Sequence, residues 1–313
     1  MNTYRLKHTL FLVVAFAACS PRATEVSAVH RGDEAFAQGN FLEALAEYRL
    51  AIRQGADDPE ITARVAHTYA LMGRVDDAGA YYVDATARDP DLADQAVSDL
   101  MRLARDAQAS QDRFAMATAV ETALRLRPGV GVGTMSLPLA RHYFQNGQYG
   151  RALPFYQKAM AEATDSVPEI VFEVGQAHEE IGDCQHALIF FERFREMVRP
   201  WERGEVDWYI GTCAFNIARD LRGRSVDTAE LAEALRLINR TVEVGEPRNI
   251  QAQAWYEKGE ILAEMGDCEA AMEAYAQVRY ADQAGSLIDR AQDRFDQIRF
   301  GRGLEHLRDG RCR

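Results

Sequence analysis

The residues best suited to chemistry are histidines and cysteines in the second half of the chain. His178, Cys184 and His186 lie close together in the sequence, and zinc sites use such side chains, but they need four ligands that converge tetrahedrally. The spacing specifies no fourth ligand, so we expect no metal site. Nor does the chain contain a Cys-x-x-Cys, His-Glu-x-x-His, Gly-x-Ser-x-Gly or phosphate-loop pattern. The sequence therefore predicts a protein that is not an enzyme and has no cofactor or small-molecule substrate.

The first residues are typical of an exported protein. Arg5 and Lys7 form a short basic region, and an apolar run of residues 9–18 follows it. Roughly ten apolar residues cannot cross a hydrocarbon layer of about 30 Å, so this run indicates a signal sequence and not a membrane span. We therefore expect residues 1–18 to be absent from the mature protein.

The end of the apolar run resembles a bacterial lipobox. Ala17 and Ala18 precede Cys19, and in a lipobox such a cysteine receives diacylglycerol. The resemblance implies a lipoprotein anchored in the membrane at Cys19, with residues 19–24 as a lipidated linker. Ser20, and not aspartate, follows the cysteine, which resembles lipoproteins sorted to the outer membrane, and we expect the protein to face the periplasm. Cleavage after Ala17 is the alternative and would give a soluble periplasmic or secreted protein.

The charge of the chain limits the kinds of partner. The formal net charge is −12, and an acidic surface repels nucleic acid and anionic lipid headgroups while it favours basic partners. Such a charge also keeps a protein soluble. We expect no nucleic acid among the partners, and we expect a protein partner with a basic binding segment.

A repeated pattern predicts how the chain is organised. Residues 39–51 are echoed 34 residues later by residues 73–85, with the same residue types at four matched pairs of positions: Gly39/Gly73, Ala44/Ala78, Tyr48/Tyr82 and Ala51/Ala85. A self-echo at a fixed period indicates an array of one supersecondary unit. The period and residue types resemble the tetratricopeptide repeat (TPR), a pair of antiparallel helices, and the resemblance extends over residues 25–278.

The resemblance implies an all-α fold, a right-handed TPR superhelix (an α-solenoid) of about seven helix pairs. Repeats are expected to start near residues 25, 59, 97, 133, 168, 204 and 252, within a solenoid of residues 25–285. The turn glycine of each repeat is replaced in the third and sixth repeats by Gln111 and Ala218. The sixth repeat is also longer, and we assign its extra length to a polar loop at residues 221–228. Residues 286–313 are expected to form a capping helix and a tail.

Four further cysteines read as disulfides in an exported protein. Cys184 and Cys268 occupy the same repeat position, at the start of a second helix, and Cys213 lies in the first helix of the repeat that follows Cys184. That helix stacks on the second helix before it in a TPR array. We therefore expect a Cys184–Cys213 bridge and, by remainder, a Cys268–Cys312 bridge. Buried reduced cysteines are the alternative.

The resemblance also assigns a binding groove. In TPR proteins the first helix of each repeat lines the inner face at its second, fifth, ninth and twelfth positions. In repeats five to seven the peptide-binding residues are then Phe172, Gln176, Glu179, Trp208, Thr212, Phe215, Tyr256 and Glu260, with Glu169, Glu205, Gln253 and Ala263 completing the pattern. Aromatic rings among carboxylates suit an extended or helical peptide that carries Arg or Lys. A register error of one residue would instead place some of these side chains in the packing between helices.

Taken together, these features resemble bacterial TPR lipoproteins of the cell envelope, such as those that serve pilus secretins or the β-barrel assembly machine. We expect a non-enzymatic scaffold that binds a peptide segment of a partner within an envelope assembly. Two alternatives remain. One is a thiol-redox factor or other enzyme accessory factor built on the cysteines, and the other is a glycan-binding module that uses the aromatic groove.

Overall fold

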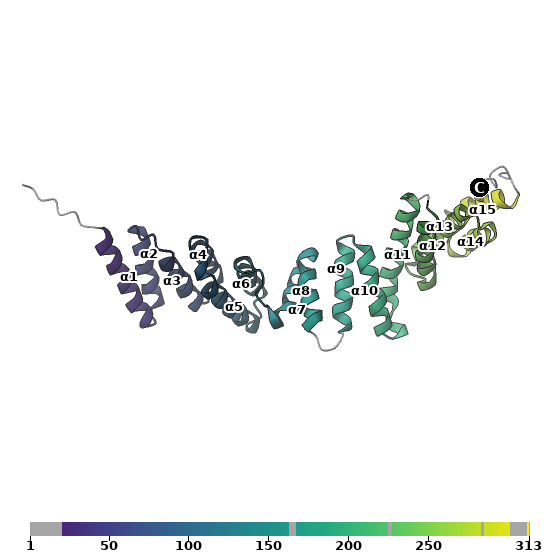
Figure 1. Ribbon diagram of the computed structural model, residues 1–313. Helices are drawn as coiled ribbons and strands as arrows, with labels where there is room; N and C mark the ends of the chain where they lie inside the picture. The colour runs from purple at the N-terminus through teal and green to yellow at the C-terminus, as the bar shows by residue number, and fades with distance from the viewer. Residues whose placement is uncertain (1–20, 163–166, 225–226, 283–284, 301–311, 313) are drawn as a thin grey trace, which may run out of the picture. The chain divides into compact units, whose positions relative to one another are not determined.

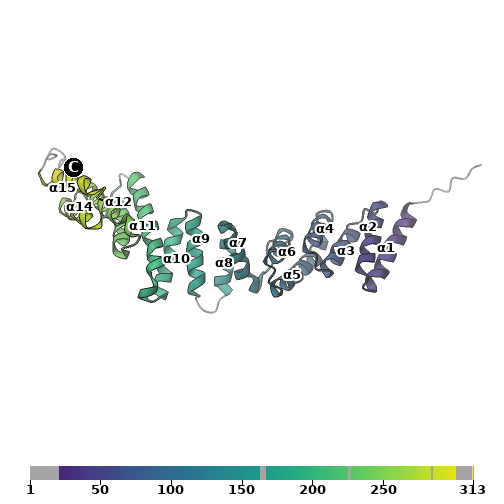
Figure 2. The same cartoon turned by 180° about the vertical axis from the view of Figure 1, so that it is seen from behind.

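The computed structural model describes residues 21–162, 167–224, 227–282, 285–300 and 312. Every regular element among these residues is helical, which confirms the expected all-α architecture (Figures 1 and 2). The chain divides into two compact units, residues 1–135 and 136–313, which are described separately. The signal sequence and Cys19 lie outside the described residues. No helix in the described part of the chain is both long and apolar enough to span a membrane.

The first unit contains three helix pairs. Their bounds are α1 (Pro21–Ala37), α2 (Phe41–Arg53), α3 (Pro59–Leu71), α4 (Val75–Arg88), α5 (Ala93–Ala109) and α6 (Arg113–Leu126), with short 3-10 turns η1 (Pro90–Leu92) and η2 (Gly133–Met135). Helix α1 begins four residues before the expected repeat start, so residues 21–24 of the expected linker are helical. Proline is favoured at the first helical position, because its missing N–H is not needed there.

The described residues of the second unit form four helix pairs and a final helix. These are α7 (Ser136–Gln145), α8 (Tyr149–Glu162), α9 (Pro168–Glu180), α10 (Cys184–Met197), α11 (Gly204–Arg224), α12 (Thr228–Val244), α13 (Gln251–Met265), α14 (Cys268–Ala281) and α15 (Ile288–Arg299), with η3 (Pro200–Glu202) and η4 (Arg248–Ile250). Both views show α9, α10 and α11 side by side, and α15 packs on α14 as a capping helix. The expected helix starts at Pro59, Pro168 and Gly204 coincide with the observed ones.

The turn inside each repeat needs a left-handed backbone. Gly182 has φ +80° and Gly266 has φ +86° in the α9–α10 and α13–α14 turns, a region that glycine enters without the steric cost paid by other residues. In the third repeat Gln111 occupies the same place and adopts φ +60°. The turn is therefore kept where the glycine is missing, in agreement with the expectation of a degenerate third repeat.

The sixth repeat differs from the expectation. Residues 221–224 continue α11 and do not form a loop, and Ala218 lies buried within that helix. Asp227 caps the next helix by accepting a hydrogen bond from the Ala229 N–H. The last turn of α11 is held in place because Arg222 forms ion pairs with carboxylates of α13. The additional residues of the sixth repeat therefore lengthen its first helix, α11, which has 21 residues.

In the first, fifth and seventh repeats a ring of the second helix packs against a glycine of the first. A Cβ atom built on Gly175 would lie 2.6 Å from the Phe191 ring, and one built on Gly259 would lie 2.6 Å from the Tyr275 ring. Such distances are far below van der Waals contact, so the two helices can approach this closely only with glycine. This packing fixes the face of the first helix that carries the candidate site.

Candidate peptide-binding surface on α9, α11 and α13

An aromatic cluster joins the fifth and sixth repeats. The Phe172 ring of α9 lies with its centroid 4.7 Å from that of Phe194 and 5.7 Å from that of Tyr209. Tyr209 in turn stacks on Phe191 at 4.8 Å. Phe172 is half-buried and packs against the core of these two repeats. It therefore forms the base of the surface and offers little area of its own to a partner.

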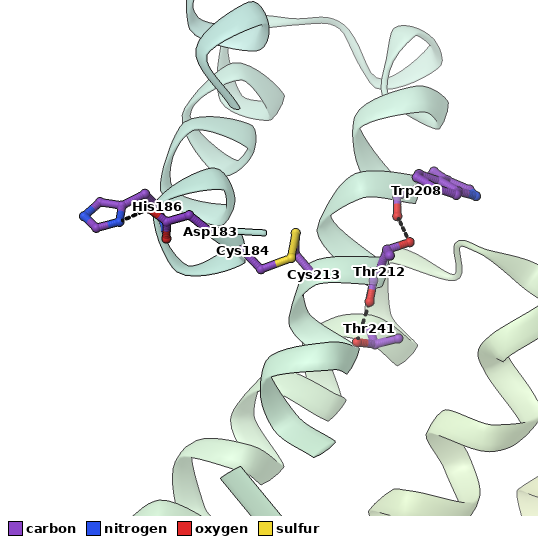
Figure 3. Close-up of a disulfide and its surroundings, with 8 residues drawn as sticks. Asp183, Cys184, His186, Trp208, Thr212, Cys213 and Thr241 are labelled. Atoms are coloured by element: carbon purple, nitrogen blue, oxygen red, sulfur yellow. Dashed lines mark hydrogen bonds and ion pairs between the residues drawn. A yellow bond between two sulfur atoms is a disulfide. The ribbon is translucent and has the colours of Figure 1, made fainter. Parts of the chain in front are cut away.

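Trp208 is the most accessible member of the predicted set. Its side chain is 44% exposed and meets Tyr209 edge to face, with centroids 5.1 Å apart. One turn later, the Thr212 hydroxyl donates to the Trp208 carbonyl oxygen at 2.8 Å. Figure 3 shows the indole pointing away from the helix and from the neighbouring Cys184–Cys213 disulfide. The ring thus combines rigid support by Tyr209 with a face that can contact another molecule.

Phe215 does not belong to the surface. It is only 4% exposed and packs in a core cluster with Leu231 and Ile238 of α12 and with Ile261 of α13. The prediction that Phe215 binds a peptide is therefore wrong. The twelfth position is buried in other repeats too, since Ala70 and Ala263 are 0% and 1% exposed, and a large ring at this position enters the core.

Two polar residues of α9 lie on the same face as Phe172. The Gln176 amide donates to the Tyr209 hydroxyl at 3.1 Å, which ties α9 to α11. Glu179 is half-buried, and no cation pairs with it among the described residues. Burial, assisted by the neighbouring charge of Glu180, raises the pKa of Glu179 above its usual value. A partly desolvated carboxylate of this kind gains from an incoming cation.

The seventh-repeat residues of the predicted site are already engaged. Tyr256 is half-buried, its ring lies 5.7 Å from that of Tyr275, and the Arg290 guanidinium covers it at 5.2 Å. Glu260 accepts hydrogen bonds from the Tyr275 hydroxyl and from Arg294, both at 2.7 Å. Tyr256 therefore has a cation of this chain on its ring, and Glu260 is not the open acidic group that the sequence led us to expect.

Glu260 also belongs to an ion-pair network between α11 and α13. Arg222 lies 2.6 Å from Glu257 and 3.0 Å from both Glu260 and Glu264. Burial acts to raise the pKa of Glu260, but the hydrogen bonds from Tyr275 and Arg294, with the charges of Arg294 and Arg222, bring that pKa below its usual value. The carboxylate stays ionised and serves to hold the helices together.

A pattern in the sequence could have indicated that Glu260 accepts a hydrogen bond within its own repeat. Asp33 and Glu260 each follow a packed helix glycine, and each accepts a hydrogen bond from the tyrosine fifteen positions further on, Tyr48 or Tyr275. In the fifth repeat the two positions hold Gln176 and a phenylalanine, which has no hydroxyl group. In the first and seventh repeats the ninth position thus supplies the acceptor for the tyrosine, whereas Gln176 bonds across to α11.

Two disulfides fasten the second unit. Cys184 bonds to Cys213, with Cα atoms 5.1 Å apart, and Cys268 bonds to Cys312, with Cα atoms 5.5 Å apart. The second bridge brings Cys312 against α13, where its N–H donates to the Ala263 carbonyl oxygen at 2.8 Å. All four cysteines in the described part of the chain are therefore in the pairs expected from the sequence.

The helix pairs, the left-handed turns and the glycine–aromatic packing are repeated features, and family models for the tetratricopeptide repeat match residues 30–93, 137–198 and 252–284, just over half of the chain. The chain belongs to the tetratricopeptide repeat superfamily. The TPR fold expected from the sequence is thereby confirmed. Proteins of this superfamily are generally non-enzymatic scaffolds for protein–protein interaction.

Several solved structures are similar to this chain. A tetratricopeptide repeat protein from Parabacteroides merdae is 14% identical and covers 87% of this chain and 98% of its own, with a TM-score of 0.29. YrrB, described as a TPR protein with an unusual peptide-binding site, is 17% identical and covers 68% and 97%, with a TM-score of 0.34. PilW, described as a type IV pilus biogenesis factor, is 16% identical and covers 76% and 100%, with a TM-score of 0.30. No curated protein matches the sequence.

Proposed function

We propose that this protein is a non-enzymatic scaffold of the bacterial cell envelope that binds a peptide segment of a partner protein around Trp208. The observation that carries the proposal is the exposure of this one indole on a firm aromatic base. Trp208 is 44% exposed, while Phe172 and Tyr209 beside it are half-buried and Phe191 is fully buried. Tryptophan is among the residues that most often dominate binding energy at interfaces, especially when its neighbours hold it rigidly.

Acidic side chains on α9 and α11, the two helices that meet at the Gln176–Tyr209 hydrogen bond, define the chemistry of the segment. Glu179 is partly desolvated and has no cationic partner among the described residues, and Glu205 is exposed one turn before Trp208 on α11. A peptide that places an apolar or basic side chain on the indole and an Arg or Lys beside it would satisfy these groups. The proposed site is thus smaller than the predicted groove, because Phe215 is buried and Tyr256 and Glu260 are engaged within the chain.

The proposed place of action is the periplasmic face of the outer membrane, with the protein held by lipid at Cys19. The proposal rests on the basic region, the short apolar run and the lipobox-like residues at the start of the sequence. A lipid anchor with two or more acyl chains would keep the scaffold at the membrane. The peptide-binding repeats would then act next to envelope assemblies.

Site-specific photo-crosslinking tests the proposal directly. A photo-reactive amino acid replaces Trp208 in the cell, and the crosslinked material is identified by mass spectrometry. The matched control places the same amino acid at Ile189, which is exposed on the second helix α10. We expect a defined protein crosslink at position 208 and none at position 189. Equal labelling at both positions, or glycan at position 208 in place of protein, would contradict a peptide site at Trp208.

A further inference from the structure

Two histidines and an aspartate converge at the turn between α9 and α10. His178 is in the last turn of α9, Asp183 is the N-cap of α10, and His186 is in the first turn of α10. The Asp183 Oδ2 atom lies 3.2 Å from Nδ1 of His178 and 2.7 Å from Nδ1 of His186. One ligand atom from each of the three residues lies within 4.8 Å of the others. Around a zinc ion, ligand atoms at bond lengths of about 2.1 Å lie about 3.4 Å apart, so the separations in this cluster are close to those of a coordination site. The His178 and His186 rings stack with centroids 5.2 Å apart and an interplanar angle of 22°, and they would have to turn to direct one nitrogen each at a shared ion.

The three side chains are held in place by their surroundings. The Phe190 ring stacks on His178 with centroids 5.5 Å apart and an interplanar angle of 11°. Asp183 accepts a hydrogen bond from the His186 N–H, which fixes its carboxylate at the start of α10. The adjoining Cys184 is bonded to Cys213 of α11, so the turn is attached to the next repeat. Groups already held near the required geometry lose little freedom when they bind an ion.

The chain contains a second turn that shows what the fold alone requires. Asp267 caps α14 as Asp183 caps α10, a left-handed glycine precedes it, and Cys268 follows it in a disulfide. In that turn Leu262 and Ala270 occupy the places of the two histidines. The cap, the glycine and the disulfide therefore do not need histidines beside them. The pair at residues 178 and 186 is an addition to the turn of the fifth repeat.

We propose that His178, Asp183 and His186 bind a divalent transition-metal ion such as Zn²⁺. Two imidazoles and one carboxylate are a donor set that suits zinc, copper, nickel and iron. Cys184 is not a ligand because it is in a disulfide, and Asp183 supplies the third ligand that the spacing of histidines and cysteines had not indicated. The expectation of no metal site is therefore replaced by a three-ligand site, with its remaining coordination positions open to water or to a side chain of another protein.

The proposed metal site is separate from the proposed peptide surface. Figure 3 shows the His186 and Trp208 side chains on opposite sides of the Cys184–Cys213 disulfide, pointing away from each other. A substitution in one place thus leaves the contacts of the other unchanged. Failure of either proposal can be distinguished from failure of the other.

Zinc titration of the purified full-length protein with its disulfides intact tests the metal site. The probe is Zn²⁺ alone, followed by calorimetry and by competition with a chromophoric chelator, after a thiol assay has shown that the four bridged cysteines are not reduced. We expect one Zn²⁺ to bind with a dissociation constant of about 10 µM or tighter, and we expect His186→Ala to weaken binding at least about tenfold, as the loss of a metal contact does. His186 is 62% exposed, so this variant keeps its fold.

Two matched controls make the test decisive. Asp183→Asn removes a charged ligand but keeps the N-cap, since asparagine caps helices as well as aspartate does, whereas Asp267→Asn makes the same change at the turn without histidines. We expect weaker zinc binding in the first variant and unchanged binding in the second. His30→Ala, at the exposed His30–Glu34 pair of α1, should also leave binding unchanged. The proposal is overturned if the parent protein binds no zinc below about 100 µM, or if His186→Ala and Asp183→Asn bind it as tightly as the parent.

Discussion

Replacing Arg222 by methionine is expected to destabilise the second unit by about 3 kcal/mol. Arg222 is three-quarters buried and lies within 3.0 Å of Glu257, Glu260 and Glu264. A unit charge pair at 4 Å is worth about 4 kcal/mol at an effective dielectric constant of 20, but desolvation and the mutual repulsion of the three carboxylates offset most of the summed attraction. Removing one partner of a buried pair costs about 3–5 kcal/mol, and partial exposure places this case at the lower end of that range.

Thermal and urea unfolding, followed by circular dichroism, measure the effect. For a unit of this size, a loss of about 3 kcal/mol corresponds to a fall of about 6–12 °C in the melting temperature. The matched control is Arg224→Met on the same helix, whose side chain is 78% exposed and pairs with the exposed Asp220. That substitution should change stability by less than about 1 kcal/mol. Equal stability of the two variants would refute the reasoning.

The loss caused by Arg222→Met should depend on pH. The pKa of folded Glu260 is lowered, so its pairing contributes stability above the carboxyl pKa of the unfolded chain, about 4.3, and this contribution is lost as the pH falls through the folded pKa. In the variant the crowded carboxylates also lose their repulsion once they are protonated. The difference between parent and variant should therefore be largest near pH 7 and should shrink below about pH 4. A difference that stays constant over this range would mean that lost packing, and not charge, explains the change.

Two further predictions concern α11 and the anchor. Gly211→Ala should destabilise the protein by about 2 kcal/mol in urea unfolding, because the new Cβ would lie 1.7 Å from the Glu246 carbonyl oxygen and overpacking outweighs the gain in helix propensity. Gly223→Ala, which meets no atom within 4 Å, should instead stabilise the same helix by up to about 1 kcal/mol. Cys19→Ala should move the protein from the membrane to the soluble fraction in cell fractionation, and mass spectrometry of the parent should find acyl chains on Cys19.

The sequence predicts the helix pairs well because the signals for them are local. Prolines at helix starts, such as Pro59 and Pro168, and glycines in left-handed turns, such as Gly182, act within a few residues of where they stand. The end of α11 was predicted less well. Residues 221–224 read as a loop beside Gly223, but Arg222 is held by carboxylates 35 to 42 positions further along the chain. Contacts at such separations leave no mark on local residue patterns.

The candidate site was only partly predictable, because it too depends on contacts between residues that are far apart in the sequence. The position of Trp208 along its helix correctly predicted that it lies on an exposed face. Helix position could not distinguish a carboxylate that is free to bind a partner from one that accepts a hydrogen bond from a buried tyrosine, as Glu260 does from Tyr275. Phe215 was misplaced because its burial depends on contacts with α12 and α13, which follow it in the chain. Asp183 was missed as a partner of the histidines because it reads as an ordinary helix cap, a role that it also has.

The most direct test of the account is the affinity of the partner for Trp208→Ala, measured together with the stability of this variant. Once crosslinking has identified the partner, its binding segment is titrated against both proteins, and both are unfolded in urea. We expect binding to weaken by about 2 kcal/mol, roughly thirtyfold, with a stability change below about 1 kcal/mol, because an exposed ring adds little to repeat stacking. A large loss of stability would mean that Trp208 serves the fold, and unchanged affinity would place the binding site elsewhere on the protein.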